Sequence, residues 1–191
     1  MSTKPKIAVP AAAAFAAVLL TVATAGAAPQ DRVARGKYLV TVGGCNDCHT
    51  PLKMGPNGPE PDWSRMLSGH PEQMKLPPAP TMPEGPWNTA VAATLTAWSG
   101  PWGTSFPANL TPDGETGLGR WTEKEFVATL RTGRHLGRGR QILPPMPWFN
   151  YAQMTDEDLA SVFAYLQSIP AIRNKVPAPI PPAAAPTAAA R

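Results

Sequence analysis

The sequence predicts an all-α protein in which short helices are joined by long, ordered loops. Proline and glycine account for 25 and 16 of the 191 residues, which is too many for long helices or continuous strands. Hydrophobic residues make up 43% of the chain and charged residues only 16%, so the chain should fold around an apolar core. Three segments carry helix signals. We therefore expect one domain with about three main helices.

The first helix is expected at about residues 31–43. Its apolar side chains recur with helical spacing around a small residue, Gly36, and the Gly43-Gly44 pair ends it. It leads directly into the two cysteines of the chain, Cys45 and Cys48.

The other two helices each begin with the same signal. Thr122 is the expected N-cap of one helix, and Glu125 follows three residues later in the position of a capping box. Thr155 and Asp158 repeat this spacing in the other helix, and apolar residues flank both N-caps. The expected ends of the two helices are Gly133 and Pro170.

Residues 51–108 form a long insert that is rich in proline and tryptophan. The insert holds 12 prolines and four of the six tryptophans, so it is too aromatic for a flexible linker and we expect an ordered loop. A small β-hairpin is expected inside it, with strands at residues 91–98 and 102–106 and a turn at 99–101. Residues 176–191 are almost wholly proline and alanine and should form a disordered tail.

The N-terminus has the pattern of a secretory signal peptide, residues 1–27. Lys4 and Lys6 precede 24 uncharged residues, and the small residues up to Ala27 favour cleavage there. The alternative is an uncleaved membrane anchor, because 24 uncharged residues are long enough to span a bilayer. Cleavage would leave 15 basic and 13 acidic side chains, a net charge of +2 in place of +4. The sequence has no run of five basic residues, so we expect no nucleic-acid partner.

The motif Cys45-Asn46-Asp47-Cys48-His49 is C-x-x-C-H, the attachment sequence of c-type haem. Residues three apart lie on one face of a helical turn, so both thiols can reach the two vinyl groups at one edge of a porphyrin and form thioethers. His49 then offers an imidazole nitrogen to the iron as an axial ligand.

A cysteine pair has three other uses: a redox dithiol, half of a zinc site, or a disulfide within the pair. Zinc would need two further ligands, and the remaining histidines, His70 and His135, are isolated in the sequence. A redox dithiol would follow a strand in a βαβ unit, whereas a helix is expected before Cys45. Export to an oxidising compartment, where c-type haem is attached, also favours one covalently bound haem.

Met146 is the expected second axial ligand. Prolines at 144, 145 and 147 fix the backbone around it, so its side chain can be held in one position beside the iron. Met154 is better explained as packing before the third helix. Another methionine or an open sixth position are the remaining alternatives, and an open position would favour ligand binding over electron transfer.

Several stretches besides the C-x-x-C-H motif share the pattern of one family. They are residues 35–39, 109–113, 117–121 and 145–148, the last leading into 156–170. In these stretches the chain resembles class I cytochromes c, particularly bacterial c-type cytochromes related to the cytochrome subunits of membrane-bound alcohol and gluconate dehydrogenases. The resemblance implies the all-α cytochrome c fold, with the first and last helices crossing near Gly36 and Tyr165, the 109–121 loop over the haem edge, and Met146 as axial ligand.

We expect residues 28–175 to form a periplasmic monohaem cytochrome c domain that transfers single electrons and is not itself an enzyme. Its expected partners are redox proteins, a donor dehydrogenase and an acceptor oxidase or reductase, and a membrane only if residues 1–27 are retained. The expected haem-binding residues are Cys45, Cys48, His49 and Met146. The alternatives are an electron-transfer subunit of a larger dehydrogenase complex, and a haem enzyme or sensor with an open axial site.

Overall fold

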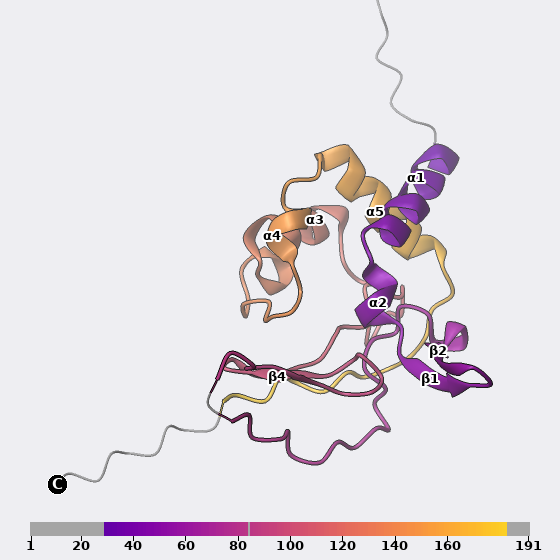
Figure 1. The fold of residues 1–191 in the computed structure, drawn as a ribbon. Helices are drawn as coiled ribbons and strands as arrows, with labels where there is room; N and C mark the ends of the chain where they lie inside the picture. Colours follow the sequence, from indigo (N-terminus) through magenta and orange to yellow (C-terminus); the bar gives the residue numbers. More distant parts are fainter. Residues whose placement is uncertain (1–28, 84, 183–191) are drawn as a thin grey trace, which may run out of the picture.

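Two helices from opposite ends of the chain, α1 (Pro29–Val42) and α5 (Asp156–Ser168), cross each other in the computed structural model (Figure 1). A short helix, α2 (Cys45–His49), follows α1 after a two-residue turn. On the other side, α3 (Glu123–Thr132) packs against α5, and α4 (Trp148–Tyr151) packs against α3. α1 and α3 therefore both pack on α5, while α2 and α4 lie against α1 and α3.

The structure describes residues 29–83 and 85–182. The expected signal peptide, residues 1–27, lies outside this part of the chain, and so do residues 183–191 of the expected tail. Within the described ranges, every helix is too short or too polar to cross a bilayer.

The contact between α1 and α5 is so close that it depends on a glycine. A Cβ atom on Gly36 would overlap the main-chain carbonyl of Ser161 and would lie 2.7 Å from the Cβ atom of Tyr165. The crossing expected near Gly36 and Tyr165 is therefore confirmed. An ion pair of 2.9 Å between Arg35 Nε and Asp158 Oδ1 links the same two helices.

The helix ends follow the expected capping signals. Thr122 Oγ1 accepts a hydrogen bond from the main-chain N–H of Glu125 at 3.2 Å, and the Glu125 carboxylate accepts one from the N–H of Thr122 at 3.0 Å. Gly133 ends α3 with a φ of 64°. Thr155 caps α5 in the same way, at 3.1 Å from the N–H of Asp158, but the Asp158 carboxylate binds α1 instead of completing a capping box.

The prediction of an all-α protein is wrong, because the insert contains two small antiparallel sheets. The first sheet pairs β1 (Leu52–Gly55) with β2 (Gly58–Pro61). The second has the order β3 (Ala90–Val91), β4 (Trp98–Gly100) and β5 (Gly103–Ser105). Such short strands carry almost no alternation of apolar and polar residues, so the strand pattern in the sequence is weak. Two turns of 3-10 helix complete the elements, η1 (Trp63–Arg65) and η2 (His135–Gly137).

Each sheet contains one tight hairpin. Pro56-Asn57 joins β1 to β2, and the following Gly58 has a φ of 117°, a backbone conformation that favours glycine. The hairpin expected around residue 100 is present between β4 and β5, but it is shorter and turns at residues 101–102. Residues 92–97 form a turn back to β3 instead of lengthening β4.

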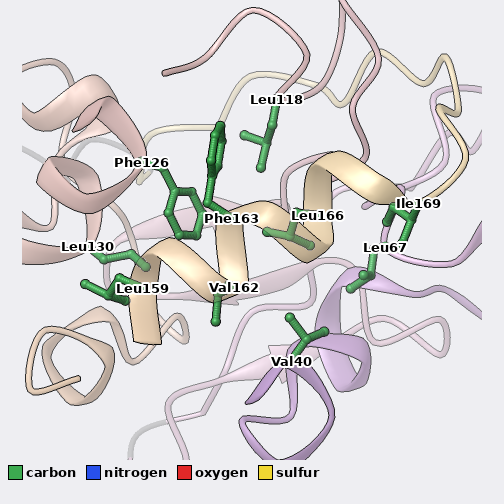
Figure 2. Packing of buried hydrophobic residues seen from close by; sticks show 10 residues of the cluster. All are labelled: Val40, Leu67, Leu118, Phe126, Leu130, Leu159, Val162, Phe163, Leu166 and Ile169. Atoms are coloured by element: carbon green, nitrogen blue, oxygen red, sulfur yellow. The ribbon is translucent and has the colours of Figure 1, made fainter. Parts of the chain in front are cut away.

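The apolar core surrounds α5 (Figure 2). Phe126 of α3 and Phe163 of α5 lie with their ring centroids 5.3 Å apart, while Val40 reaches α5 from α1 and Leu67 reaches it from the insert. Full burial of each such side chain contributes about 1.5–3 kcal/mol to stability. The buried cluster consists of Val40, Leu67, Leu118, Phe126, Leu130, Leu159, Val162, Phe163, Leu166 and Ile169.

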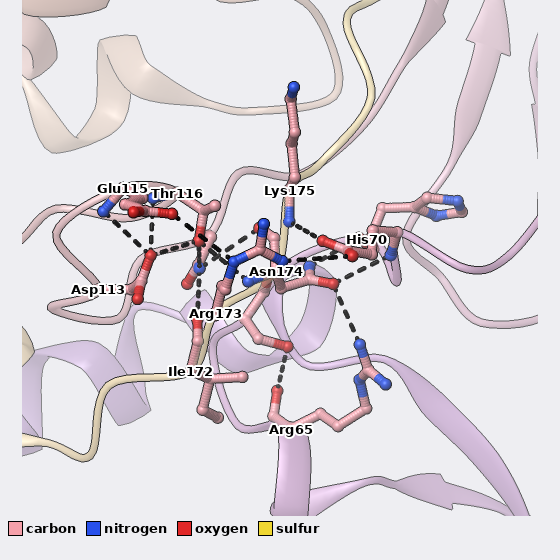
Figure 3. A network of polar contacts seen from close by, with 12 residues as sticks. Arg65, His70, Asp113, Glu115, Thr116, Ile172, Arg173, Asn174 and Lys175 are labelled. Atoms are coloured by element: carbon pink, nitrogen blue, oxygen red, sulfur yellow. Dashed lines mark hydrogen bonds and ion pairs between the residues drawn. The ribbon is translucent and has the colours of Figure 1, made fainter.

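The chain beyond α5 binds the insert through a buried asparagine, Asn174 (Figure 3). Its Nδ2 donates to the carbonyls of Ser68 and His70, at 2.7 and 2.8 Å. Its Oδ1 accepts from the Arg65 guanidinium at 3.1 Å and from the N–H of Glu72 at 3.0 Å. All four hydrogen-bonding positions of this amide are therefore occupied, as a buried polar group requires.

Further along, Ile180 exchanges two main-chain hydrogen bonds with Thr104 of β5, at 2.8 and 2.9 Å. Residues 176–182 therefore differ from the disordered tail that we expected. The prediction of disorder rests on the lack of an apolar anchor in this segment. Main-chain pairing holds the segment instead, and composition does not reveal such pairing.

Replacing Gly36 with Ala should lower the free energy of unfolding by about 1–3 kcal/mol, the usual cost of an overpacked contact. At an unconstrained helix position the same change would stabilise by up to about 1 kcal/mol, so the sign of the effect tests the close crossing. Gly114→Ala is a suitable control, because the nearest atom to a Cβ there is 4.0 Å away. Chemical denaturation measures both variants, and an unchanged or more stable Gly36→Ala protein would contradict this account.

Candidate functional site

The C-x-x-C-H motif forms α2, one short helical turn directly after α1. Gly44 precedes it with a φ of 67°, a left-handed conformation that lets the chain change direction between the two helices. Cys45 and Cys48 lie three residues apart in this turn, and both are free and partly exposed. The two sulfur atoms therefore share one face of the turn, as thioether attachment to one porphyrin edge requires.

His49, the last residue of α2, is buried and has a fixed orientation. Only 8% of the residue is exposed, and its Nδ1 lies 2.7 Å from the carbonyl oxygen of Ala108. Because a carbonyl only accepts, Nδ1 carries the proton and donates, which leaves the lone pair on Nε2. This is the arrangement found in metal-ligating histidines, whose second ring nitrogen donates to a carbonyl or carboxylate.

The insert holds the Ala108 carbonyl in place. Gly69 donates its N–H to the carbonyl of His49 at 2.8 Å, and His70 donates to the carbonyl of Pro107 at 3.1 Å. Gly69 has a φ of 77°, and a Cβ there would lie 2.7 Å from the Ala108 carbonyl oxygen. Residues 69–70 thus contact both His49 and the segment 107–108 that holds its acceptor.

A second contact fixes the residue after the histidine. Thr50 is buried; its hydroxyl donates to the Asn46 side chain at 2.9 Å and accepts from the N–H of Leu67 at 2.9 Å. The attachment turn is therefore bonded both within itself and to the insert.

Burial shifts the pKa of all three motif side chains. It raises the pKa of Cys45 to about 11 and also raises the pKa of Cys48, so both are thiols at neutral pH. Cysteines of disulfide oxidoreductases have lowered pKa values instead, which speaks against the redox dithiol. Burial lowers the pKa of His49, against the opposing effect of its hydrogen bond to Ala108, and so favours the neutral imidazole that binds a metal.

The other two histidines have separate environments. His70 is buried, with Nδ1 2.9 Å from Thr96 Oγ1 and its ring centroid 4.9 Å from that of Phe106. His135 is exposed and lies edge-on to Trp121, 5.0 Å between centroids. Among the described residues, no three His, Cys, Asp or Glu side chains gather as ligands of a metal ion, so the arrangement does not support the zinc alternative.

Met146 lies in the segment 142–147, here called the strap, which is hydrogen-bonded to the rest of the protein at Ile142 and at Pro144. The N–H of Ile142 donates to the carbonyl of Gly133 at 2.8 Å, and the Ser105 hydroxyl donates to the carbonyl of Pro144. After the strap, the Trp148 indole covers Gly133 so closely that any Cβ there would collide with it. The partly buried Met146 side chain packs against the core cluster, as does that of Met154.

Tyr151 of α4 reaches the same corner of the molecule as the cysteines. Its hydroxyl donates to the carbonyl of Gly43 at 2.6 Å. Burial raises the pKa of Tyr151 to about 12, and the nearby Cys45 and Cys48 add to this effect, so the phenol remains a donor at neutral pH. The sequence does not point to Tyr151 or Ala108, because neither belongs to a motif and Ala108 contributes only a main-chain oxygen.

Taken together, the motif residues fit a covalently bound haem. Two thiols share one face of a turn, and a buried imidazole on the same turn has one nitrogen occupied by Ala108 and the other left for a ligand. The structure brings Cys45, Cys48 and His49 together on α2, while the role of Met146 stays a prediction.

Comparison with known proteins gives three informative relatives, and no protein-family model matches the chain. The chain is 28% identical over 145 residues to the fructose dehydrogenase cytochrome subunit of Gluconobacter japonicus, which covers 76% of this chain and 23% of that protein. It is 29% identical over 133 residues to the gluconate 2-dehydrogenase cytochrome c subunit of Pantoea cypripedii, covering 70% and 22%. It is 33% identical over 72 residues to the cytochrome c subunit of the quinone alcohol dehydrogenase of Gluconobacter oxydans, covering 36% and 15%.

The matched part of the chain thus spans less than a quarter of the length of each of these curated relatives. Their names agree with the resemblance carried by the C-x-x-C-H motif and the stretches around it. The chain is similar to bacterial c-type cytochromes, in particular to the cytochrome subunits of fructose, gluconate and quinone alcohol dehydrogenases.

Proposed function

We propose that this chain is an electron-transferring c-type cytochrome that serves a dehydrogenase, as a subunit of its complex. The observation that carries the proposal is the geometry of α2: two free thiols on one face of a turn, followed by His49 with Nδ1 held at 2.7 Å from the Ala108 carbonyl. The relatives support the dehydrogenase as electron donor, since the names of all three describe cytochrome subunits of dehydrogenases.

The chain's own residues would bind one haem. Cys45 and Cys48 would hold the porphyrin through thioethers, and His49 would offer Nε2 as one axial ligand. Met146 would supply the other from its strap. When bound, the haem provides an iron that alternates between ferrous and ferric states and so carries one electron at a time.

Covalent attachment is tested by acid-acetone extraction of the purified protein. The haem should remain with the polypeptide, and Cys45→Ala or Cys48→Ala should each lower the covalently bound fraction, because each removes one thioether. Asp47→Asn is the matched control, since its exposed side chain lies in the same turn and should not change the yield. Free extraction of haem from the wild-type protein would contradict the c-type assignment.

Loss of Met146 should open the sixth position. Met146→Ala should remove the weak long-wavelength absorption band of Met-ligated ferric haem, lower the reduction potential, and allow carbon monoxide to bind, because a neutral thioether stabilises ferrous iron and blocks the site. Met154→Ala is the control, because that side chain packs on the same core cluster and should only reduce stability. If the wild-type protein already lacks the band and binds carbon monoxide, an open-site haem protein becomes the better description.

We also propose export to the periplasm by residues 1–27. Native purification from separated periplasmic and membrane fractions should give a polypeptide that begins near Ala28 and co-purifies with a dehydrogenase subunit. A protein that keeps residues 1–27 and stays in the membrane would favour the anchor, and a cytochrome recovered alone would favour a free electron carrier.

A further inference from the structure

One hydrogen bond links residues that flank the two proposed axial ligands, His49 and Met146. The Tyr151 hydroxyl donates to the carbonyl of Gly43 at 2.6 Å. Gly43 lies two residues before Cys45, at the start of the attachment turn, and Tyr151 lies five residues after Met146. The bond therefore connects the linker just before the C-x-x-C-H turn to α4, the helix that follows the methionine strap.

The local packing makes this bond well defined. A Cβ on Gly43 would lie 3.5 Å from Cε1 of Tyr151, so the aromatic ring lies against the glycine. The acceptor is a carbonyl just beyond the last turn of α1, where main-chain oxygens lack helical partners. The half-buried ring also packs against the core cluster, which keeps the hydroxyl directed at this oxygen.

The other attachments of the strap lead elsewhere. Ile142 and Trp148 both contact Gly133, at the end of α3, and Pro144 accepts from Ser105 of β5. Beyond α4, the Arg131 guanidinium donates to the carbonyl of Ala152, again from α3. These contacts fix the strap to α3 and to β5, and β5 leads within three residues to Ala108, the acceptor of His49. The Tyr151 bond is the contact that reaches the residues before Cys45 from α4.

We propose that Tyr151 is a positioning residue whose hydrogen bond to Gly43 holds the Met146 strap beside the attachment turn, where Met146 would help to hold the haem. The inference rests on the proposed function, in which Met146 is an axial ligand. Without the hydroxyl, α4 loses its hydrogen bond to the residues before Cys45, and the strap is held less firmly beside the attachment turn. An external ligand should then displace the thioether more easily.

The test uses the ferric holoprotein and imidazole, which binds the iron only when the thioether leaves. Tyr151→Phe should raise the apparent affinity for imidazole by about two- to tenfold, the factor that corresponds to one net hydrogen bond. Tyr165→Phe is the matched control, because this tyrosine packs on the same cluster and its hydroxyl has no hydrogen bond to any described residue. The imidazole affinity of this variant should equal that of the wild type.

Two measurements separate a positioning role from a structural one. If Tyr151→Phe unfolds at a lower denaturant concentration but binds imidazole like the wild type, the tyrosine only stabilises the fold and the inference is overturned. Met146→Ala tests the underlying function in the same titration. If Met146→Ala binds imidazole tightly and Tyr151→Phe binds it like the wild type, only the inference about Tyr151 is overturned. If Met146→Ala and the wild type bind imidazole equally weakly, the role of Met146 is overturned, and the inference with it.

Discussion

The hydrogen bond from His49 to the carbonyl of Ala108 is the contact around which much of the remaining structure is arranged. It joins residues 59 positions apart, at the two ends of the proline-rich insert. For the imidazole to keep one orientation, the insert must place the Ala108 carbonyl within hydrogen-bond distance of His49 Nδ1. A flexible loop of that length would not do this, since its end would sample many positions.

The internal structure of the insert meets this requirement. Its two sheets fold the chain back on itself. Residues 67–70 lie alongside residues 107–110, with main-chain hydrogen bonds from Leu110 to Leu67 and from His70 to Pro107. The chain beyond α5 adds a second layer of support, because the buried Asn174 amide binds the carbonyls of Ser68 and His70. The ion pairs of Arg173 with Glu72 and Glu115, both 3.6 Å, lie at the surface and contribute little.

The sequence predicts the helical part of this protein better than the rest, for physical reasons. Capping signals act locally, so Thr122, Gly133 and Thr155 mark helix ends without knowledge of the fold. The motif residues are likewise recognisable by type and spacing. The strands of the insert are held by main-chain pairing between short segments, and every residue type except proline can both donate and accept in such pairing. The same holds for the acceptor of His49. Every residue type has a main-chain carbonyl, so no sequence pattern identifies residue 108 as the acceptor.

The pairing of Ile180 with Thr104 has a consequence for self-association. β5 is an edge strand of the second sheet, and an edge with free main-chain groups can pair with a strand of another molecule and start aggregation. The chain's own C-terminal segment occupies both main-chain groups of Thr104. Pro181 and Pro182 follow immediately, and because proline lacks an N–H, this added segment is itself a poor template for a further strand.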